Sequence, residues 1–436
     1  MYKINVNSLA NGKELNDDEV KLLSDMNNNF THVLYASKSK ITCVKPCRMH
    51  GESHIFLSVE EFANYTSDYL TIAGSNAGRA WFKWPGKNKK LDGVGFYPHE
   101  IKCPNNVFNT YIKPKIVPIQ GDCSIYLNHL HKVICAGDSV AYEYLIKYIA
   151  HIIQKPHEKP SVAVVMKSVE GTGKGTMMNP LLKIFGAQGI HLNGDRHITG
   201  QFNGAVANKL LIFADEVNLT STATADKLKS FISESTVQME KKGLEAVAIP
   251  NYARVFFASN RHHVIAAGVK ERRYLVLEPC PKLAQHKEYF EKLYSWIDSQ
   301  GDAKLFHYFS NLNIEDFNPF CAPSTKALID QKLQSLSFSH QFIYDNLLDK
   351  TGFAKEARIQ ATKLIERYLF WCENKNISIR PGSARSQIGK LMTQIVGSSI
   401  GRSDRGDGKY YELLDVEEMR ENFAHLLNLQ SQDIFE

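Results

Sequence analysis

Continuous apolar runs dominate the middle of the chain. Four of them lie within residues 162–168, 209–216, 253–260 and 272–279, segments that also include the polar residues at the ends of the runs. Uninterrupted apolar runs of this length are typical of parallel strands that are covered on both faces. Between the runs, residues 177–186 and 225–235 show the apolar spacing of helices. We therefore predict an α/β fold with a parallel sheet over residues 161–280.

Different patterns lie on either side of this predicted core. Residues 1–122 hold short β-like runs broken by Gly, Pro and Asn, which predicts a β-rich N-terminal domain. Residues 123–160 have helical spacing up to Pro156 and predict a helical collar or linker. Residues 281–348 predict a helical extension of the core. Residues 349–436 predict helix, helix, β-turn and helix, an order that fits a winged-helix-like domain.

The composition is that of a globular chain. Its 436 residues suggest two to three domains, and the fractions of hydrophobic (43%) and charged (22%) residues are ordinary. No apolar run is long enough to cross a membrane, and the first residues lack an apolar signal segment. The eight cysteines are scattered, which favours a reducing compartment such as the cytoplasm.

Charge is distributed unevenly towards the C-terminus. The chain has a net charge of +6, but residues 350–410 hold twelve Lys or Arg and five Asp or Glu, while residues 411–436 hold one Arg and seven acids. Such a basic segment indicates either a polyanion partner or an ordinary solvated surface. The candidate DNA-binding residues in this segment are Arg358, Lys363, Arg367, Arg380, Arg385 and Lys390.

A glycine-rich segment follows the first apolar run. It reads SVEGTGKGT over Ser168–Thr176 and leads into a helical pattern. A phosphate needs several backbone N–H groups, a helix N-terminus and one long cation. Gly171 and Gly173 let the backbone approach a phosphate, and Lys174 can reach the terminal phosphates. The predicted nucleotide-binding residues are Glu170, Gly171, Thr172, Gly173, Lys174, Gly175 and Thr176.

This segment departs from the usual phosphate-loop pattern at two positions. Ser168 stands where the first glycine is expected, and Gly175 stands where a hydroxyl is expected directly after the lysine. Thr176 follows one place later, and we predict that its hydroxyl coordinates Mg²⁺. The same GKGT order occurs in adenylate kinases, so the departure is compatible with nucleotide binding.

Polar residues end two of the other apolar runs. Asp215 and Glu216 follow one run and Asn260 follows the next. Ligands of α/β sheets bind at the carboxyl ends of the strands. We predict that Asp215 holds Mg²⁺, that Glu216 deprotonates the attacking water, and that Asn260 holds this water. Alternatively, the acids cap a strand and the asparagine is an ordinary loop residue.

Two arginines precede the last apolar run. Arg272 and Arg273 are candidates for a guanidinium that stabilises charge on the γ-phosphate held by a neighbouring subunit. A surface salt bridge is the alternative.

The order of these motifs resembles that of a known family. GTGKGT, LLIFADE, FFASN and ERRY occur in the order found in superfamily 3 helicases. The pair Phe202-Asn203 and the segments GVGFYP and GDCSIYLNHL are similar to the phage and plasmid primase-helicases related to the poxvirus primase-helicase. The resemblance covers about residues 70–340 and implies a P-loop ATPase core that is AAA+-like.

This resemblance implies a function. It implies an ATP- and Mg²⁺-dependent DNA helicase that forms a hexameric ring, moves on single-stranded DNA at replication forks and works in the cytoplasm of a bacterial host. A primase or polymerase domain is implied on the same or another chain. DNA would be gripped by a β-hairpin tip at Lys241 and Lys242, and Arg273 matches the family's arginine-finger position better than Arg272. A solvated hairpin is the alternative.

Two other functions remain open. The GKGT order fits a nucleotide phosphotransferase similar to adenylate kinase, although the acid strand and the late arginines argue against it. The third possibility is a DNA-binding replication initiator that uses ATP only as an assembly switch.

Two further constellations lie in the N-terminal part. Cys43, Cys47, His50 and His54 are either zinc ligands or part of an ordinary hairpin. The segment Trp81–Lys90 mixes aromatic and basic residues, which suits either single-strand stacking or core aromatics beside a basic loop.

Overall fold

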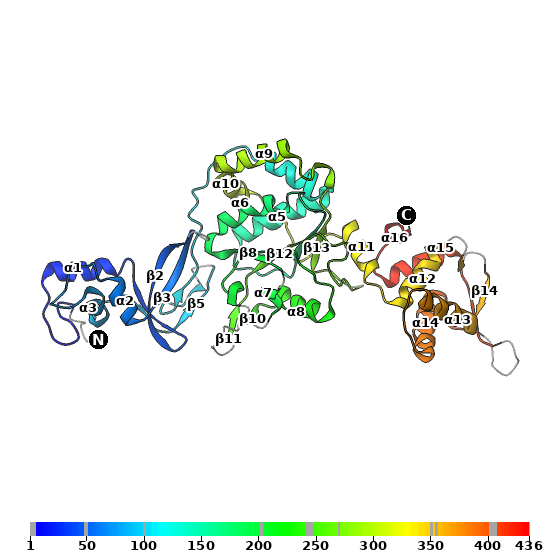
Figure 1. Cartoon of the computed structure of the whole chain (residues 1–436), viewed down its shortest axis with the longest axis horizontal. Helices are drawn as coiled ribbons and strands as arrows, with labels where there is room; N and C mark the ends of the chain where they lie inside the picture. The colour runs from blue at the N-terminus through cyan, green and yellow to red at the C-terminus, as the bar shows by residue number, and fades with distance from the viewer. Residues whose placement is uncertain are drawn as a thin grey trace.

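Three bodies follow one another along the longest axis of the protein (Figure 1). The structure is a computed structural model. It describes residues 6–47, 51–98, 102–194, 196–200, 204–239, 247–268, 271–348, 352–353, 356–400 and 408–435. The N-terminal body lies at one end, a five-stranded sheet with its helices lies in the middle, and the C-terminal helices lie at the other end. In the described part of the chain, no helix combines the length and apolar character that a membrane crossing requires.

The N-terminal body is a mixed domain, not only a β-rich one. Its sheet has the order β3-β2-β1-β4. Its elements are α1 (Asp17–Met26), β1 (Thr31–Tyr35), β2 (Lys38–Cys47), β3 (Gly51–Leu57), α2 (Val59–Tyr65), α3 (Ala77–Lys83) and β4 (Lys89–Lys90). The helices begin at side-chain caps from Asn16, Ser58 and Asn76. Two of them have only seven residues, too short for a clear apolar period, and this is why the sequence pattern did not reveal them.

A helical segment connects this body to the core, as the apolar spacing predicts. It follows the short strands β5 (Val94–Gly95) and β6 (Phe108–Asn109) and contains α4 (Ser124–Asn128), a π-helical turn (His129–Ile134) and α5 (Ser139–Gln154). The Asp138 carboxylate accepts two backbone N–H groups at the start of α5.

The core is a five-stranded, fully parallel sheet of order β13-β7-β12-β9-β8. The strands are β7 (Ala163–Lys167), β8 (Gly189–Asn193), β9 (Leu211–Asp215), β12 (Arg254–Ser259) and β13 (Tyr274–Leu277). Along β7, Val164 and Met166 belong to one apolar cluster while Ala163 and Val165 belong to another. Because successive side chains point to opposite faces of a sheet, an uninterrupted apolar strand packs into the apolar clusters on both faces.

The edge strand β8 was not predicted. Along Gly189–Asn193 only Gly189 and Leu192 are buried, and the polar residues His191 and Asn193 are exposed. Its sequence therefore lacks the apolar run that identifies the other four strands.

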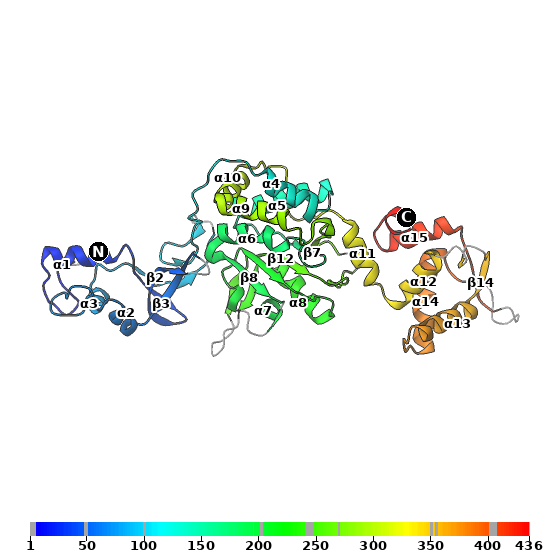
Figure 2. The same cartoon turned by 45° about the horizontal axis from the view of Figure 1, so that its top comes forward.

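Helices cover both faces of the sheet (Figure 2). The remaining core elements are α6 (Lys174–Phe185), α7 (Arg196–Thr199), α8 (Thr222–Ser233), β10 (Thr236–Met239), β11 (Val247–Pro250), α9 (Lys287–Trp296), α10 (Asp302–Asn311) and α11 (Lys326–Gln334). Helices α4, α5, α6, α9 and α10 lie on one side, and α7 and α8 lie on the other. β10 and β11 form an antiparallel hairpin between β9 and β12 in the chain.

The C-terminal body has its own apolar cluster. It comprises α12 (Phe338–Leu348), β14 (Arg358–Gln360), α13 (Ala361–Asn374), α14 (Pro381–Val396), β15 (Tyr410–Glu412), α15 (Val416–Leu426) and α16 (Gln432–Phe435). Phe342, Ile343 and Leu347 of α12 are buried in this cluster. Helix α12 therefore packs with the C-terminal body, although the sequence pattern placed it in the extension of the core.

Candidate functional site

The glycine-rich segment forms a loop between β7 and α6. β7 ends at Lys167 and α6 begins at Lys174. Gly171 and Gly173 have φ angles of 76° and 88°, a left-handed backbone that side chains disfavour. Gly173 is the N-cap of the 12-residue helix α6 and makes no side-chain capping bond. The first N–H groups of α6 therefore have no side-chain acceptor, an arrangement that can accept an anion.

The Lys174 side chain closes this loop. Its ammonium group donates to the Ser168 carbonyl and hydroxyl oxygens at 2.9 and 3.0 Å and to the Val169 carbonyl at 3.1 Å. It also donates to Oδ1 of Asn260 at 3.0 Å. Only 7% of Lys174 is exposed, and burial lowers its pKa, while the carboxylates of Asp215 and Glu170 oppose this shift. The site therefore combines a buried cation with two nearby acids.

The register of the sheet explains why these residues meet. β12 lies between β7 and β9, with Ser259 opposite Lys167 and Phe257 opposite Ala214. The carboxyl ends of all three strands therefore lie on the same side of the sheet, beside the loop. Asn260 follows β12 directly, and its side chain contacts Lys174 of the loop. Its Nδ2 also donates to Glu170 at 3.2 Å, so it joins Lys174 and an acid of the loop.

Glu216 has a strained backbone. Its φ angle is +55°, and its N–H donates to Oδ1 of Asp215 at 2.9 Å. A left-handed conformation of a non-glycine residue costs about 1 kcal/mol or more and is found where the surroundings enforce it. The Glu216 side chain is exposed beside the site. The structure thus brings Lys174, Asp215 and Glu216 to one edge of the sheet, and their chemical roles remain predictions.

The predicted magnesium hydroxyl has another partner. The Thr176 hydroxyl lies 2.9 Å from the Tyr294 hydroxyl of α9, and Thr176 is buried. The Ser168 hydroxyl, in contrast, contacts the lysine, with its oxygen 3.0 Å from Lys174 Nζ. A methyl group built on Gly175 would have no neighbour within 4 Å. The magnesium role of Thr176 therefore remains a prediction with no supporting contact.

The described residues hold no preformed metal cluster. Among them, no three His, Cys, Asp or Glu side chains are grouped as metal ligands. Magnesium is usually held by one or two carboxylates together with waters and substrate phosphates. A single Asp215 beside a phosphate-binding loop is compatible with such a site.

A buried histidine supports the loop from behind, and the sequence pattern did not identify it. Nε2 of His129 lies 3.2 Å from the Gly173 carbonyl, and Nδ1 lies 2.9 Å from the Tyr289 hydroxyl. His129 is fully buried, and burial lowers its pKa to about 4. The ring is therefore neutral at pH 7. Because a carbonyl only accepts hydrogen bonds, Nε2 carries the proton and Nδ1 accepts from Tyr289.

A second backbone contact holds the loop. The N–H of Gln285 donates to the Gly171 carbonyl at 3.0 Å. His129 precedes strand β7 in the chain, and Gln285 follows strand β13. Two carbonyls of the loop are thus turned towards flanking segments, which leaves the following N–H groups directed the other way.

Arg272 and Arg273 lie at the amino ends of the parallel strands, whereas the loop lies at their carboxyl ends. Tyr274 pairs with Ala163 at the amino end of β7, whereas Lys174 follows the carboxyl end of that strand. Arg273 donates to the Ser233 hydroxyl at 2.9 Å and lies 3.5 Å from the Glu271 carboxylate, while Arg272 is exposed. Within one chain, these arginines do not reach Lys174.

The predicted DNA-binding tip lies outside the described residues. Met239 and Val247 form the last described pair of β10 and β11, and these two antiparallel strands lie between the acid strand and the asparagine strand in the sequence. Lys241 and Lys242 lie outside the described residues, and so does the pair Phe202-Asn203.

The N-terminal zinc alternative is wrong for the residues that the structure describes. Cys43 pairs with Ile55, and His54 pairs with Val44 on the neighbouring strand. Neighbouring pairs point to opposite faces of a sheet, so Cys43 and His54 cannot share a metal ion. Cys43 is buried and His54 contacts the Phe108 ring. His50 and the side chain of Cys47 lie outside the described residues.

The aromatic residues of the Trp81–Lys90 segment belong to the core. Trp81 is fully buried and Trp84 is 3% exposed. Their indole N–H groups donate to Asn27 Oδ1 and to the Val6 carbonyl. These rings therefore cannot stack on a single strand.

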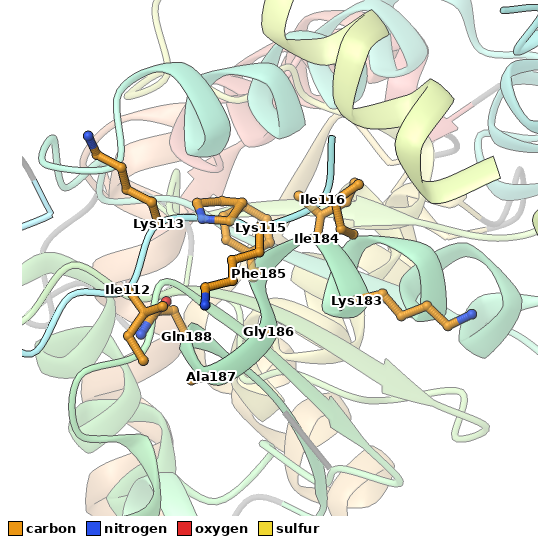
Figure 3. Close-up of a pocket in the computed structure, with 11 residues that line it drawn as sticks. Ile112, Lys113, Lys115, Ile116, Lys183, Ile184, Phe185, Gly186, Ala187 and Gln188 are labelled. Carbon is orange, nitrogen blue, oxygen red and sulfur yellow. The ribbon is translucent and has the colours of Figure 1, made fainter. Parts of the chain in front are cut away.

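A hollow of about 300 Å³ lies at the far end of α6 and is not part of this site (Figure 3). It is lined by residues 112–116 and 183–188. Lys115 extends beside Gln188, while the amino groups of Lys113 and Lys183 point away in opposite directions.

Comparison with known proteins identifies relatives of this chain. A family of unknown function (DUF5906) matches residues 166–273, from the end of β7 to the arginine pair. The DNA primase-polymerase of Nitratiruptor phage NrS-1 is 26% identical over 189 residues, which are 42% of this chain and 26% of that protein. The matched part thus spans about a quarter of that relative.

The similarity in structure extends further than the similarity in sequence. An apo structure of the NrS-1 C-terminal region superposes with a TM-score of 0.62 at 16% identity and covers 90% of this chain and 94% of that one. A second apo structure of that region gives a TM-score of 0.60 at 17% identity and covers 86% and 89%. The chain is therefore a homologue of the NrS-1 phage primase-polymerase and has the fold of that protein's C-terminal region.

Proposed function

We propose that this chain is the ATP-driven helicase motor of a phage or plasmid DNA-replication system. One observation carries the proposal. The buried ammonium group of Lys174 bonds to its own loop and to Asn260, beside the Asp215 carboxylate. A cation, an acid and an amide at the carboxyl edge of three adjacent strands suit binding and hydrolysis of a nucleoside triphosphate.

The residues present fit ATP with Mg²⁺. The loop offers the uncapped N-terminus of α6, and Lys174 can exchange its bonds to Ser168 and Val169 for bonds to phosphate oxygens. Asp215 would hold the magnesium ion, directly or through water. Bound ATP supplies the anhydride bond whose hydrolysis releases the free energy for movement.

Glu216 and Asn260 would handle the attacking water. Glu216 is exposed next to Asp215 and can take a proton from water. Asn260 offers an amide whose partners, Lys174 and Glu170, both belong to the loop region. A nucleotide that draws Lys174 away would free the Oδ1 atom of Asn260 for the water.

Hydrolysis can be coupled to DNA through β12. The hairpin strand β11 ends at Pro250, β12 begins at Arg254, and Asn260 follows its end. One buried strand therefore connects the site with the hairpin that carries Lys241 and Lys242. These two lysines would contact phosphates of a single strand.

The proposal includes a hexameric ring. Arg272 and Arg273 lie at the amino ends of the strands, and Lys174 follows their carboxyl ends. In the proposed ring, these arginines therefore contact the nucleotide that is bound by a neighbouring copy. Homology to a phage protein named a DNA primase-polymerase supports a role in DNA replication. It also supports a primase or polymerase domain on the same or another chain, and the cytoplasm of a bacterial host as the location.

The central test replaces Lys174 with alanine. We expect Lys174→Ala to lower single-strand-stimulated ATP hydrolysis and unwinding by about 100-fold or more, since it removes a preorganised cation from the γ-phosphate. Lys183→Ala is the matched control, because Lys183 is an exposed lysine near the C-terminal end of the helix that begins at Lys174. Unchanged hydrolysis and unwinding in Lys174→Ala would refute the proposal.

The same assays separate the alternatives. Phosphoryl transfer to AMP without DNA stimulation would indicate an adenylate-kinase-like enzyme. Tight DNA binding with negligible turnover would indicate an initiator. Electron microscopy with nucleotide and single-stranded DNA would show whether rings of about six subunits form.

A further inference from the structure

The C-terminal body has the element order of a winged helix. Helix α12 is followed by strand β14, then by α13 and α14, and finally by strand β15. Six residues, 375–380, join α13 to α14. β14 pairs with β15 in antiparallel fashion, and Ile400 forms a two-bond bridge with Tyr410. Two helices joined by a short turn, with a β-ribbon beside them, are a known arrangement for presenting a helix to a DNA groove.

Helix α14 has one buried side and one exposed polar side. Its buried residues are Ala384, Ile388, Leu391, Met392 and Ile395, which belong to the C-terminal apolar cluster. Its exposed residues include Ser383, Arg385, Ser386, Gln387, Lys390 and Gln394. Every member of the second group can donate a hydrogen bond. The cluster thus fixes the helix and directs a row of hydrogen-bonding side chains to solvent.

The charged side chains of α14 are all positive. Residues 374–403 contain five Lys or Arg and no Asp or Glu. In the described part of the chain, no ion pair neutralises Arg380, Arg385 or Lys390. On α13 the situation differs, because Arg367 pairs with Glu356 at 2.6 Å. The exposed face of α14 therefore complements a polyanion.

The chemistry of this face favours a duplex over a single strand. Non-specific grips on single strands rely on aromatic side chains that stack on bases, and α14 contains no aromatic residue. Phe338 of α12 is exposed and lines a hollow of about 600 Å³ together with Gln387 and Lys390. Base edges in the major groove are instead read by Arg, Gln and Ser side chains, the types that α14 presents.

We propose that the exposed face of α14 is a recognition surface that enters the major groove of double-stranded DNA. The groove, about 12 Å wide, admits an α-helix. Arg385 and Lys390 would contact phosphates or guanine edges, and Gln387 and Gln394 would contact bases. This goes beyond the proposed motor, which acts on one strand, and holds for the nucleotide-free protein whether or not it hydrolyses ATP.

The ribbon would add contacts beside the helix. Arg358 on β14 and Lys409 before β15 are both exposed. The Arg358 guanidinium lies 5.6 Å from the centre of the Tyr410 ring, which holds it on the ribbon surface. These cations suit the DNA backbone on one side of the groove.

The test compares binding of duplex and single-stranded DNA by the full chain without nucleotide. Fluorescence anisotropy is measured on a labelled duplex of about 20 base pairs, two helical turns, and on one of its strands. We expect Arg385→Ala/Lys390→Ala to weaken duplex binding about tenfold and to reduce the salt dependence by roughly two phosphate contacts. Binding to the single strand should stay within about twofold of the parent protein.

The matched control removes the same charge elsewhere. Lys287→Ala/Lys292→Ala alters two exposed lysines of α9 that pair with Glu291 and Glu288. This control should bind the duplex like the parent protein. A duplex loss as large as that of the α14 variant would mean that net charge alone is measured, and would overturn the proposal.

A second variant protects the test against misfolding. Ser386→Glu places a carboxylate in the middle of the exposed face and changes no buried contact. It should also weaken duplex binding, with an unchanged circular dichroism spectrum. If both α14 variants are folded and bind the duplex normally, the proposal is wrong. Equal losses on duplex and single strand would assign this surface to single strands and overturn it as well.

Discussion

The imidazole of His129 holds the backbone carbonyl of Gly173, with Nε2 3.2 Å from the carbonyl oxygen. The other ring nitrogen is held by the Tyr289 hydroxyl at 2.9 Å. His129 precedes strand β7 in the chain, whereas Tyr289 of α9 follows strand β13, so segments from before and after the sheet strands meet beside the loop. Because the Gly173 carbonyl is turned towards His129, the N–H of Lys174 is directed to the opposite side, where the phosphates of ATP are proposed to bind.

We expect His129→Ala to weaken ATP binding through the shape of the loop. The variant removes one hydrogen bond and leaves the Tyr289 hydroxyl without its acceptor. One such bond contributes about 0.5–1.5 kcal/mol, so the KM for ATP should rise by roughly three- to tenfold with a smaller change in kcat. His129→Gln keeps a donor and an acceptor and should recover part of the affinity. A folded His129→Ala protein with an unchanged KM would show that this contact does not shape the site.

Acid should destabilise the folded chain through the same residue. Burial lowers the pKa of His129 from 6.5 to about 4, so the unfolded chain binds this proton more readily than the folded chain. His129 therefore contributes its full stability above pH 6.5 and loses it as the pH falls towards 4. The slope is at most about 1.4 kcal/mol per pH unit.

Chemical denaturation at several pH values checks this dependence. His129→Gln has no ionisable group at this position and should show a shallower loss of unfolding free energy between pH 6.5 and 5. Burial likewise lowers the pKa of His151 to about 4, so part of the slope should remain in the variant. Identical slopes in the two proteins would exclude His129 as a source.

Gly173 and Gly175 should respond differently to alanine. At Gly173, φ is +88° and a new Cβ would lie 2.6 Å from Cε1 of His129. We expect Gly173→Ala to lower the free energy of unfolding by about 1–3 kcal/mol, from backbone strain and overpacking. Gly175→Ala meets no atom within 4 Å and should be neutral or stabilising by up to about 1 kcal/mol, since alanine favours the helix. Equilibrium unfolding in urea measures both, and equal effects would contradict the described loop geometry.

Arg273 should act on the nucleotide of a neighbouring copy. Lys174→Ala and Arg273→Ala should each abolish most ATP hydrolysis when assayed alone. In an equal mixture, about a quarter of the interfaces would combine an intact lysine with an intact arginine, as expected for a head-to-tail ring. Activity that reappears on mixing supports the arrangement. No recovery, despite demonstrated exchange of subunits, would place Arg273 outside catalysis.

The core strands and most of the site could be predicted from the sequence. Four of the five strands were visible as apolar runs, because burial on both faces leaves no room for polar residues. Lys174, Asp215 and Asn260 were grouped from their positions at strand ends, and the structure does bring them together. Parallel strands align their carboxyl ends, so local patterns were sufficient there.

The N-terminal constellations show where local patterns were insufficient. Cys43 and His54 have suitable types and spacing for a metal site, but the register of β2 and β3 places them on opposite faces. Trp81 lies beside basic residues in the sequence, yet its ring is buried. The spacing of residues along the chain does not determine the register of paired strands or the packing of a short helix, because both depend on residues distant in the sequence.

The sequence by itself determined the apolar strands, the glycine loop and the polar residues at the strand ends, because each of these depends on neighbours in the chain. Only the tertiary structure decided that β12 lies between β7 and β9, that His129 contacts the Gly173 carbonyl, and that Arg273 and Lys174 lie at opposite ends of the parallel strands. These relationships join residues tens of positions apart, and they arise from how the sheet and its covering helices pack.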